Sequence, residues 1–538
     1  VIYHAGNVLF KTTDGGLNWQ AISPDLTRND TTKQGDGGGP LTNEGAGGEN
    51  YNTINYVLES PLEKNLIYTG SDCGLVHLTR DGGKTWQNIT PAGLPECLIQ
   101  SIEVSPHSKG TAYISGTRYK FNDMTSLTYK TVDYGKTWTK IATGVNADDF
   151  IKVIREDKKV AGLLYAGAER GFYISFNGGA KWQQLQLNLP VVPITDLIQH
   201  DNDLVASTAG RAFWILDDVG ALQEYKGSFG DAVAKIYAPK TTVRFSSYSP
   251  PWLPENIPGI GRNPLDGVIL DYYLKEKADT NLLTLEILDA GGKVIRTYTN
   301  KKDETFKPYP GGPPPAAVIP SEAGVNRYAW DFRTEGISGV QGAFVYGDYR
   351  GYRVAPGQYK ARLSHKGSLS EVSFAVVADP RLSIAPADWT AQQQLLDRLT
   401  NDLRNMHEAV TNLRKVKKQL EALNDALKGM EKNEAMVKQG EDLIKKIDAW
   451  EANIVESRQR NFQDVINWPS KLNAEYFDLR SKVDVHDPRI TQGVRDLLRD
   501  LETQWNAHQA AMRDLISKDV VAYNQLFKEQ NIPAVIVK

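Results

Sequence analysis

The chain has little cysteine: Cys73 and Cys97 are the only two among 538 residues. So few cysteines exclude a disulfide framework or a zinc site built from cysteines. We expect two unpaired thiols, with a single bridge in an oxidising compartment as the alternative. No apolar run reaches the roughly 18 residues that cross a bilayer. With 62 basic and 65 acidic residues, the net charge of −3 offers no basic surface for nucleic acid.

The common catalytic and cofactor motifs are also missing. The eight histidines show no HExxH or other tight metal-ligand spacing. No P-loop, dinucleotide fingerprint or Gly-x-Ser-x-Gly elbow lies between a predicted strand and helix. Glycine-rich stretches at 35–40 and 44–50 interrupt a β region and open no helix, so they do not suit phosphate binding. We therefore expect neither a metal nor a cofactor.

A repeated turn pattern, S/T-x-D/N-x-G-x-x-W, fills the first part of the chain. Its four copies are marked by Asp14 and Trp19, Asp81 and Trp86, Asp133 and Trp138, and Asn177 and Trp182. The Asp or Asn positions lie 67, 52 and 44 residues apart, which suits four-stranded β-propeller blades with variable loops. A fifth, degenerate unit follows, because "AGRAFWILDD" aligns with "AERGFYISFN" but lacks the later glycines and tryptophan.

The residues of this turn have structural explanations. An Asp or Asn oxygen can accept backbone N–H bonds of its own turn, and glycine can take a positive φ there. The tryptophan supplies a large apolar anchor between neighbouring sheets. We therefore interpret the four copies as devices of the fold and not as catalytic groups.

Three regions follow from the patterns of the chain. Residues 1–225 predict the blades described above, and 226–385 alternate apolar and polar residues as in an Ig-like β-sandwich. Two proline-rich stretches, 248–264 and 309–320, interrupt that sandwich as ordered loops or as docking segments. Residues 386–538 predict an antiparallel helical bundle or a hairpin that docks another subunit. Its first helix should be capped by Asp388 and end near Gly429.

A family resemblance rests on these motifs. The four turns resemble Asp-boxes, or BNR repeats, of sialidases, xyloglucanases and sortilin-type propellers. Together with "GSDCGLVHLTRDGGKTWQNITP", "GVNRYAWDFR" and "APGQYKARL", they make the chain similar to secreted, bacterial, sortilin-like proteins that often carry the label glycosyl hydrolase. Such relatives have further blades ahead of this point. The resemblance thus implies an extracytoplasmic location and N-terminal propeller blades supplied by a separate chain or a missing segment.

Several residues are candidates for a binding or catalytic site. Asp72 and Glu169 each follow a predicted strand, and as equivalents in adjacent units they are the weak catalytic candidates. Other loop acids are Glu44, Glu49 and Asp123. The ligand-binding candidates are Glu49, Tyr51, Arg118 and Arg211, with Arg170 as a further cation. Residues 28–52 form the preferred functional loop, because long loops on a rigid scaffold often bind ligands.

Three functions fit these observations. The first is a non-catalytic propeller scaffold that binds a protein or peptide outside the cytoplasm, within a larger protein or complex. The second is a glycoside hydrolase acting on a polysaccharide, whose site is shared with N-terminal blades and would need two facing carboxyl groups. The third is a structural subunit of a cell-envelope assembly. The lack of a recognisable catalytic set favours the scaffold.

Overall fold

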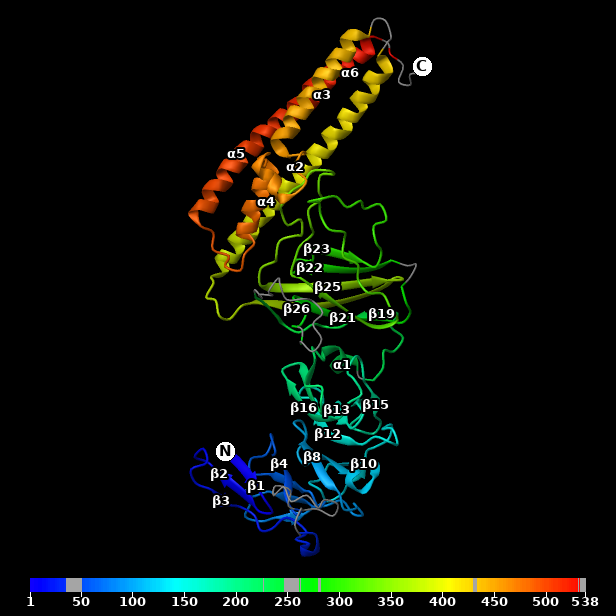
Figure 1. Cartoon of the computed structure of the whole chain (residues 1–538), viewed down its shortest axis with the longest axis vertical. Coiled ribbons are helices and arrows are strands. Elements are labelled where there is room, and N and C mark those ends of the chain that lie inside the picture. The colour runs from blue at the N-terminus through cyan, green and yellow to red at the C-terminus, as the bar shows by residue number, and fades with distance from the viewer. Residues whose placement is uncertain are drawn as a thin grey trace. The chain divides into compact units, whose positions relative to one another are not determined.

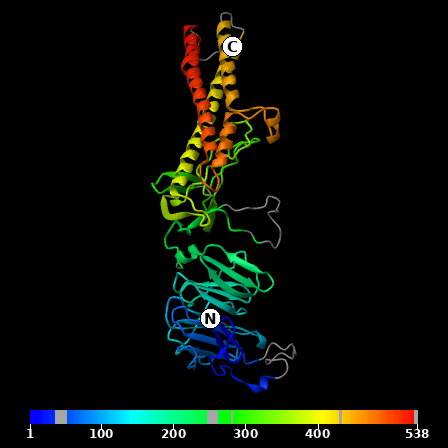
Figure 2. The same cartoon turned by 90° about the vertical axis from the view of Figure 1, so that its left-hand side faces the viewer.

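A computed structural model describes residues 1–34, 51–225, 227–245, 261, 263–278, 282–428, 433–530 and 532. The chain divides into two compact units, Val1–Gly230 and Asp231–Lys538, which are drawn in Figures 1 and 2. The first unit is mostly β-sheet, whereas the second combines sheets with long helices at its C-terminal end. The prediction of a mainly β chain with a helical C-terminal region is confirmed.

The first unit contains five consecutive antiparallel sheets. The first sheet is β1 (Ile2–Ala5), β2 (Leu9–Thr12) and β3 (Gln20–Ala21), and the second is β4 (Ile54–Glu59), β5 (Ile67–Ser71), β6 (Val76–Thr79) and β7 (Gln87–Asn88). The third is β8 (Leu98–Val104), β9 (Ala112–Arg118), β10 (Asp123–Thr131) and β11 (Thr139–Lys140). The fourth is β12 (Ile151–Glu156), β13 (Leu164–Ala168), β14 (Phe172–Ser175) and β15 (Gln183–Gln184). The fifth is β16 (Ile194–His200), β17 (Asp203–Thr208) and β18 (Phe213–Leu216), followed by α1 (Gly220–Tyr225).

Successive sheets pack face to face through separate apolar clusters. Leu9 and Ile54 share a cluster between the first and second sheets, and Ile174 and Leu197 share one between the fourth and fifth. Two further clusters lie between the second and third and between the third and fourth sheets. Because each sheet is an up-and-down meander packed on the next, the unit has the arrangement of propeller blades.

The second unit begins with two sheets that share one core. The smaller sheet has the order β19 (Ala234–Ile236), β21 (Val268–Leu274), β24 (Gly324–Trp330). The larger has the order β20 (Thr242–Arg244), β26 (Ser368–Ala378), β25 (Gly357–His365), β22 (Leu283–Asp289), β23 (Val294–Thr299), and only its β20–β26 pairing is parallel. Trp330 of the smaller sheet and Phe374 of the larger are both buried in this core, with ring centroids 6.0 Å apart. Of the two proline-rich stretches, 248–260 and residue 262 lie outside the described residues.

The helical region consists of α2 (Pro386–Leu427), α3 (Glu434–Ile454), α4 (Leu472–Val483), α5 (Gln492–Asp514), a π-helical segment (Leu515–Val520) and α6 (Val521–Glu529). Asp388 does not cap α2 as predicted; the N-cap is Ala385, because Pro386 already occupies the first turn, where its missing N–H costs nothing. Asp388 instead lies in that first turn. Gly429 lies outside the described residues.

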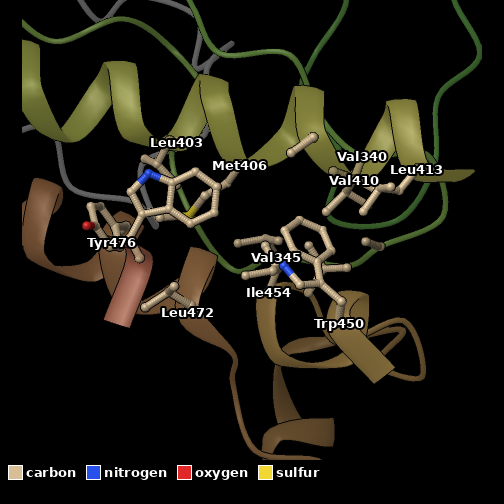
Figure 3. Packing of buried hydrophobic residues seen from close by; sticks show 14 of the residues in the cluster. Val340, Val345, Leu403, Met406, Val410, Leu413, Trp450, Ile454, Leu472 and Tyr476 are labelled. Carbon is tan, nitrogen blue, oxygen red and sulfur yellow. The ribbon is translucent and has the colours of Figure 1, made fainter. Parts of the chain in front are cut away.

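The apolar seam of α2 is the centre of the helical core. Figure 3 shows Leu403, Met406, Val410 and Leu413 directed toward residues of α3, α4 and a loop. Those partners include Trp450, Ile454, Leu472, Tyr476, Val340 and Val345. Val340 and Val345 belong to the connection between β24 and β25, so a long loop of the sandwich completes the helical core. Each fully buried leucine there contributes about 1.5–3 kcal/mol. The helices and the two sheets lie in one compact unit, Asp231–Lys538.

Candidate functional site

Strand direction sorts the loops of the first unit into two sets. The turns with Asp81, Asp133 and Asn177 connect third to fourth strands, and the turn with Asp14 connects β2 to β3 of the three-stranded first sheet; they lie at one end of each sheet, which we call the tip end. The connections from second to third strands in the other sheets, the β1–β2 connection and the connections from each sheet to the next lie at the opposite end. We call this end the loop face and define it by residues 6–8, 22–34, 51–53, 72–75, 89–97, 119–122, 141–150, 169–171, 185–193 and 209–212. Of the candidate ligand-binding residues, Tyr51, Arg118 and Arg211 lie at or next to this face.

At the tip end, each repeated turn satisfies its own polar groups. Asp133 Oδ1 accepts the Thr137 N–H at 2.9 Å and the Thr131 hydroxyl at 2.8 Å. The side-chain and backbone hydrogen bonds from Thr137 lower the pKa of Asp133 to about 2. The same bonds recur in the other copies, so these polar side chains are occupied in holding the turn.

The tryptophan of the turn makes a contact that sequence analysis missed. The indole Nε1 of Trp138 donates to the Ile89 carbonyl of the preceding sheet at 2.7 Å. Trp86 and Trp182 make equivalent bonds to the carbonyls of Ile22 and Ile141, at 2.8 and 2.6 Å. The tryptophan therefore couples neighbouring sheets by a hydrogen bond as well as by apolar packing.

The catalytic candidates do not lie on adjacent sheets, contrary to the prediction. Asp72 follows β5 of the second sheet and Glu169 follows β13 of the fourth, so the third sheet separates them. Asp72 Oδ1 accepts the Thr53 N–H at 2.9 Å, and burial raises the pKa of this carboxyl. Glu169 accepts a hydrogen bond from Lys152 Nζ at 2.8 Å. Asp72 thus fixes the start of β4, while Glu169 forms an ion pair on its own sheet.

Two of the ligand-binding candidates meet at Glu96, a residue that sequence analysis did not single out. The Tyr51 hydroxyl donates to the Glu96 carboxylate, which also pairs with Lys33 Nζ at 2.8 Å. Arg118 Nη1 donates to the Glu96 carbonyl at 2.7 Å, and its Nε donates to Asp123 at 2.9 Å. Because they belong to distant loops, only the packing of the second and third sheets brings these groups together.

The other candidates lie elsewhere or outside the described residues. Arg211 is in the connection between β17 and β18 of the fifth sheet, where its Nη1 donates to the Gly210 carbonyl at 3.0 Å. Arg170 pairs with Asp148 at the fourth sheet. Glu44 and Glu49 lie outside the described residues, as does most of the preferred loop 28–52. Cys73 and Cys97 are both buried and free.

Beside the Glu96 group, the loop face carries an exposed aromatic tip. Tyr119 and Phe121 lie in a single 3-10 turn, Tyr119–Phe121, with 43% and 38% of their surfaces exposed to solvent. Tyr119 stacks on Phe150 with ring centroids 6.1 Å apart, and the Arg118 guanidinium lies 4.8 Å from the Phe121 ring centroid. These contacts hold the two rings in place while leaving part of each open to solvent.

Each of the four complete first strands has a β-bulge at its loop-face end. The register shifts fall at Asn55, Gln100, Lys152 and Thr195, which are equivalent positions of β4, β8, β12 and β16. A bulge re-aims a side chain and is frequent beside functional sites. The four residues share only polarity, so no sequence signal distinguishes them. The fold thus presents four polar side chains at the same end as the Glu96 group.

Arg155 of β12 connects the first strands to one another. Its Nε donates to the Leu197 carbonyl at 2.8 Å, and its Nη2 contacts Asp196 Oδ1 at 2.7 Å and the Tyr56 hydroxyl at 3.2 Å. Glu103 Oε2 lies 3.7 Å from Arg155 Nη1, and burial raises the pKa of Glu103 to about 7. Since these partners come from β4, β8 and β16, the four first strands surround a common polar centre.

The described residues contain no group of three or more His, Cys, Asp or Glu side chains placed to hold a metal ion. None of the helices in that part of the chain is long and apolar enough to cross a membrane.

No family model matches the chain, and no curated protein matches it. Solved structures with similarity include YCF48 bound to D1 peptide, at 15% identity and a TM-score of 0.24, over 30% of this chain and 54% of that one. The GH74 xyloglucanase from Xanthomonas campestris matches at 12% identity and a TM-score of 0.32, over 69% and 62%. The extracellular domain of a putative hybrid two component system from B. thetaiotaomicron matches at 9% identity and a TM-score of 0.26, over 70% and 44%. Each match spans less than two thirds of the other chain.

Proposed function

We propose that the chain is a non-catalytic scaffold that binds a protein or peptide at the loop face of its first unit. The observation that carries this proposal is the combination of a partly exposed aromatic tip with charged groups that already have partners. Aromatic side chains held by neighbouring contacts supply apolar area at little entropic cost, and arginine is enriched with them at protein interfaces. Tyr119, Phe121 and Arg118 provide this combination beside Glu96.

The arrangement of carboxyl groups favours binding over glycoside hydrolysis. A glycosidase of the common type needs two carboxyl groups about 5–9.5 Å apart, facing one sugar. Asp72 is held by the Thr53 N–H and Glu169 by Lys152, on sheets that are not neighbours. Both groups are therefore occupied by contacts of the fold. A polysaccharide hydrolase remains the alternative, and it makes the opposite prediction for substitutions of these two acids.

We also propose that a further propeller blade, from a separate chain or another segment, covers the outer side of the first sheet. Trp19 has 45% of its surface exposed, whereas its equivalents Trp86, Trp138 and Trp182 donate to a carbonyl of the preceding sheet. Among the four copies of this turn, only the tryptophan of the first sheet, Trp19, thus has apolar surface that no neighbouring sheet covers. Native mass spectrometry of the protein from its source tests this, and a homogeneous 59.7 kDa species would contradict it.

The extracytoplasmic, bacterial location and the sortilin-like assignment remain part of this proposal and rest on the resemblance of the motifs. The same holds for the Ig-like character of the 226–385 region and for the three-part division at 225 and 385. A cell-envelope assembly in which the helices dock another subunit would use the same scaffold.

A peptide-display selection on the full chain tests the loop face. Selected peptides should lose binding when Phe121 is replaced by serine, because the exposed ring is removed while its backbone remains. Leu62→Ser is the matched control, since Leu62 is 40% exposed in a connection at the tip end. Equal binding of every selected peptide by both variants would refute the assignment. Turnover of a polysaccharide that is abolished by Asp72→Asn or Glu169→Gln would instead establish the hydrolase.

A further inference from the structure

The fifth sheet lacks a part that the second, third and fourth sheets share. In each of those sheets a tryptophan precedes a two-residue fourth strand, and its indole contacts the sheet before it. In the fourth sheet, Gln183 and Gln184 pair with Ile174 and Tyr173 of β14, directly after Trp182. The described fifth sheet contains only β16, β17 and β18, and the chain continues into α1 without a tryptophan.

The residue that would accept the missing indole is nevertheless in place. Leu185 directly follows the fourth strand of the fourth sheet, as Ile141 does in the third. The N–H of Leu185 donates to the Phe172 carbonyl, just as the N–H of Ile141 donates to the Thr128 carbonyl, both at 2.8 Å. Leu185 is therefore the structural counterpart of Ile141, whose carbonyl receives the Trp182 indole.

An apolar pocket lies beside Leu185, between the fourth and fifth sheets. Leu185, Leu189 and Phe172 line it from the fourth sheet, and Ala206, Trp214 and Leu216 line it from the fifth. Leu187 lies at this pocket with 66% of its surface exposed. On the open side, β18 pairs only with β17 among the described strands, so one of its edges is unpaired. Phe213 and Ile215 of this strand are 75% and 59% exposed.

We propose that this pocket and the free edge of β18 bind an extended, tryptophan-containing peptide of a partner protein. The peptide adds to β18 as a fourth strand, and its tryptophan enters the pocket with the indole N–H directed to the Leu185 carbonyl. Backbone hydrogen bonds along an exposed edge supply affinity, and a side-chain pocket supplies specificity in such strand addition. The three complete interfaces define the expected register, in which the two residues after the tryptophan pair with Ile215 and Trp214. This site uses residues of the fourth and fifth sheets, whereas the aromatic tip Tyr119–Phe121 belongs to the third, so it does not depend on the function proposed for that tip.

Binding of a synthetic peptide to the full chain tests the proposal. The probe copies residues 135–142, "GKTWTKIA", which contain Trp138 and the fourth strand of the third sheet. We expect the same peptide with W138A to bind at least about tenfold more weakly in fluorescence anisotropy, because the indole is the anchor. Equal affinity of the two peptides, or no binding of the tryptophan peptide at millimolar concentration, would overturn the proposal.

Variants of the chain locate the bound peptide. Leu187→Asn should weaken binding at least about threefold, since asparagine tolerates the positive φ of 46° at this position but removes the apolar contact. Leu17→Asn is the matched control, because Leu17 is 83% exposed on the first sheet. Equal loss in both variants would contradict the assigned pocket. Phe121→Ser should leave binding of this peptide unchanged, so failure of the loop-face proposal can be distinguished from failure of this one.

Discussion

Replacing Trp182 by phenylalanine tests the hydrogen bond that couples neighbouring sheets. Trp182 is 1% exposed, and its Nε1 donates to the carbonyl of Ile141, which is itself 5% exposed. Phenylalanine keeps an aromatic ring but leaves this buried carbonyl without its donor, at a cost of about 1–3 kcal/mol. The smaller ring adds a cavity term of about 1 kcal/mol. We therefore expect a local destabilisation of at least about 2 kcal/mol.

Trp19→Phe is the matched control within the same repeated turn. Trp19 is 45% exposed, so its replacement should change stability by less than about 0.5 kcal/mol. Hydrogen exchange followed by mass spectrometry measures the opening of each sheet, which a single unfolding midpoint of a two-unit chain cannot separate. A loss of 2 kcal/mol accelerates exchange of protected amides in β13 and β14 about 30-fold. Equal effects of the two substitutions would refute the coupling by the indole hydrogen bond.

Three further predictions concern other contacts. Burial raises the pKa of Glu103 from 4.5 to about 7, so the folded protein keeps a proton on this carboxyl that the unfolded chain releases. The free energy of unfolding should therefore fall as the pH rises from about 4.5 to 7. In urea unfolding, Glu103→Gln should make this pH dependence flatter. Asp484→Asn should destabilise the second unit by about 1.5 kcal/mol in thermal unfolding. The buried Arg333 loses the nearest of its three carboxylate partners, 3.2 Å away, and keeps Asp331 and Asp348 at 3.6 Å; an unchanged melting temperature would contradict this. Gly83→Ala should cost about 1–3 kcal/mol more than Gly16→Ala by hydrogen exchange, because a Cβ on Gly83 would lie 2.4 Å from the Ile22 carbonyl oxygen. Gly16 has a similar φ, +100° against +103°, but a Cβ there would come no closer than 3.8 Å to another residue, the Trp19 ring.

The repeated turns show how far local chemistry alone determines structure. An Asp or Asn oxygen, a nearby hydroxyl and a glycine with positive φ satisfy one another within about six residues, so their pattern predicts each turn without knowledge of the fold. The 3.6-residue periodicity of α2 likewise predicts a long helix with one buried face. The prediction that Asp388 caps this helix is wrong. Pro386 occupies the first turn of α2, so the cap is Ala385.

The sites depended on contacts between residues that are distant in sequence. Asp72 and Glu169 looked equivalent because each follows a similar strand, but the number of sheets between them is a property of the packed chain. Glu96 could not be singled out from the sequence, because its contacts with Tyr51 and Arg118 join three different segments of the chain.

The sequence by itself determined the elements whose stabilising contacts are local: the turns, the alternating strands and the long helices. The tertiary structure decided which sheets are neighbours, where the bulges lie and which loops share an end. It also decided that a sandwich loop completes the helical core and that a pocket opens beside the fifth sheet. The physical reason is that these features arise from the burial of surfaces contributed by several segments, and no single segment records the shape of its partner.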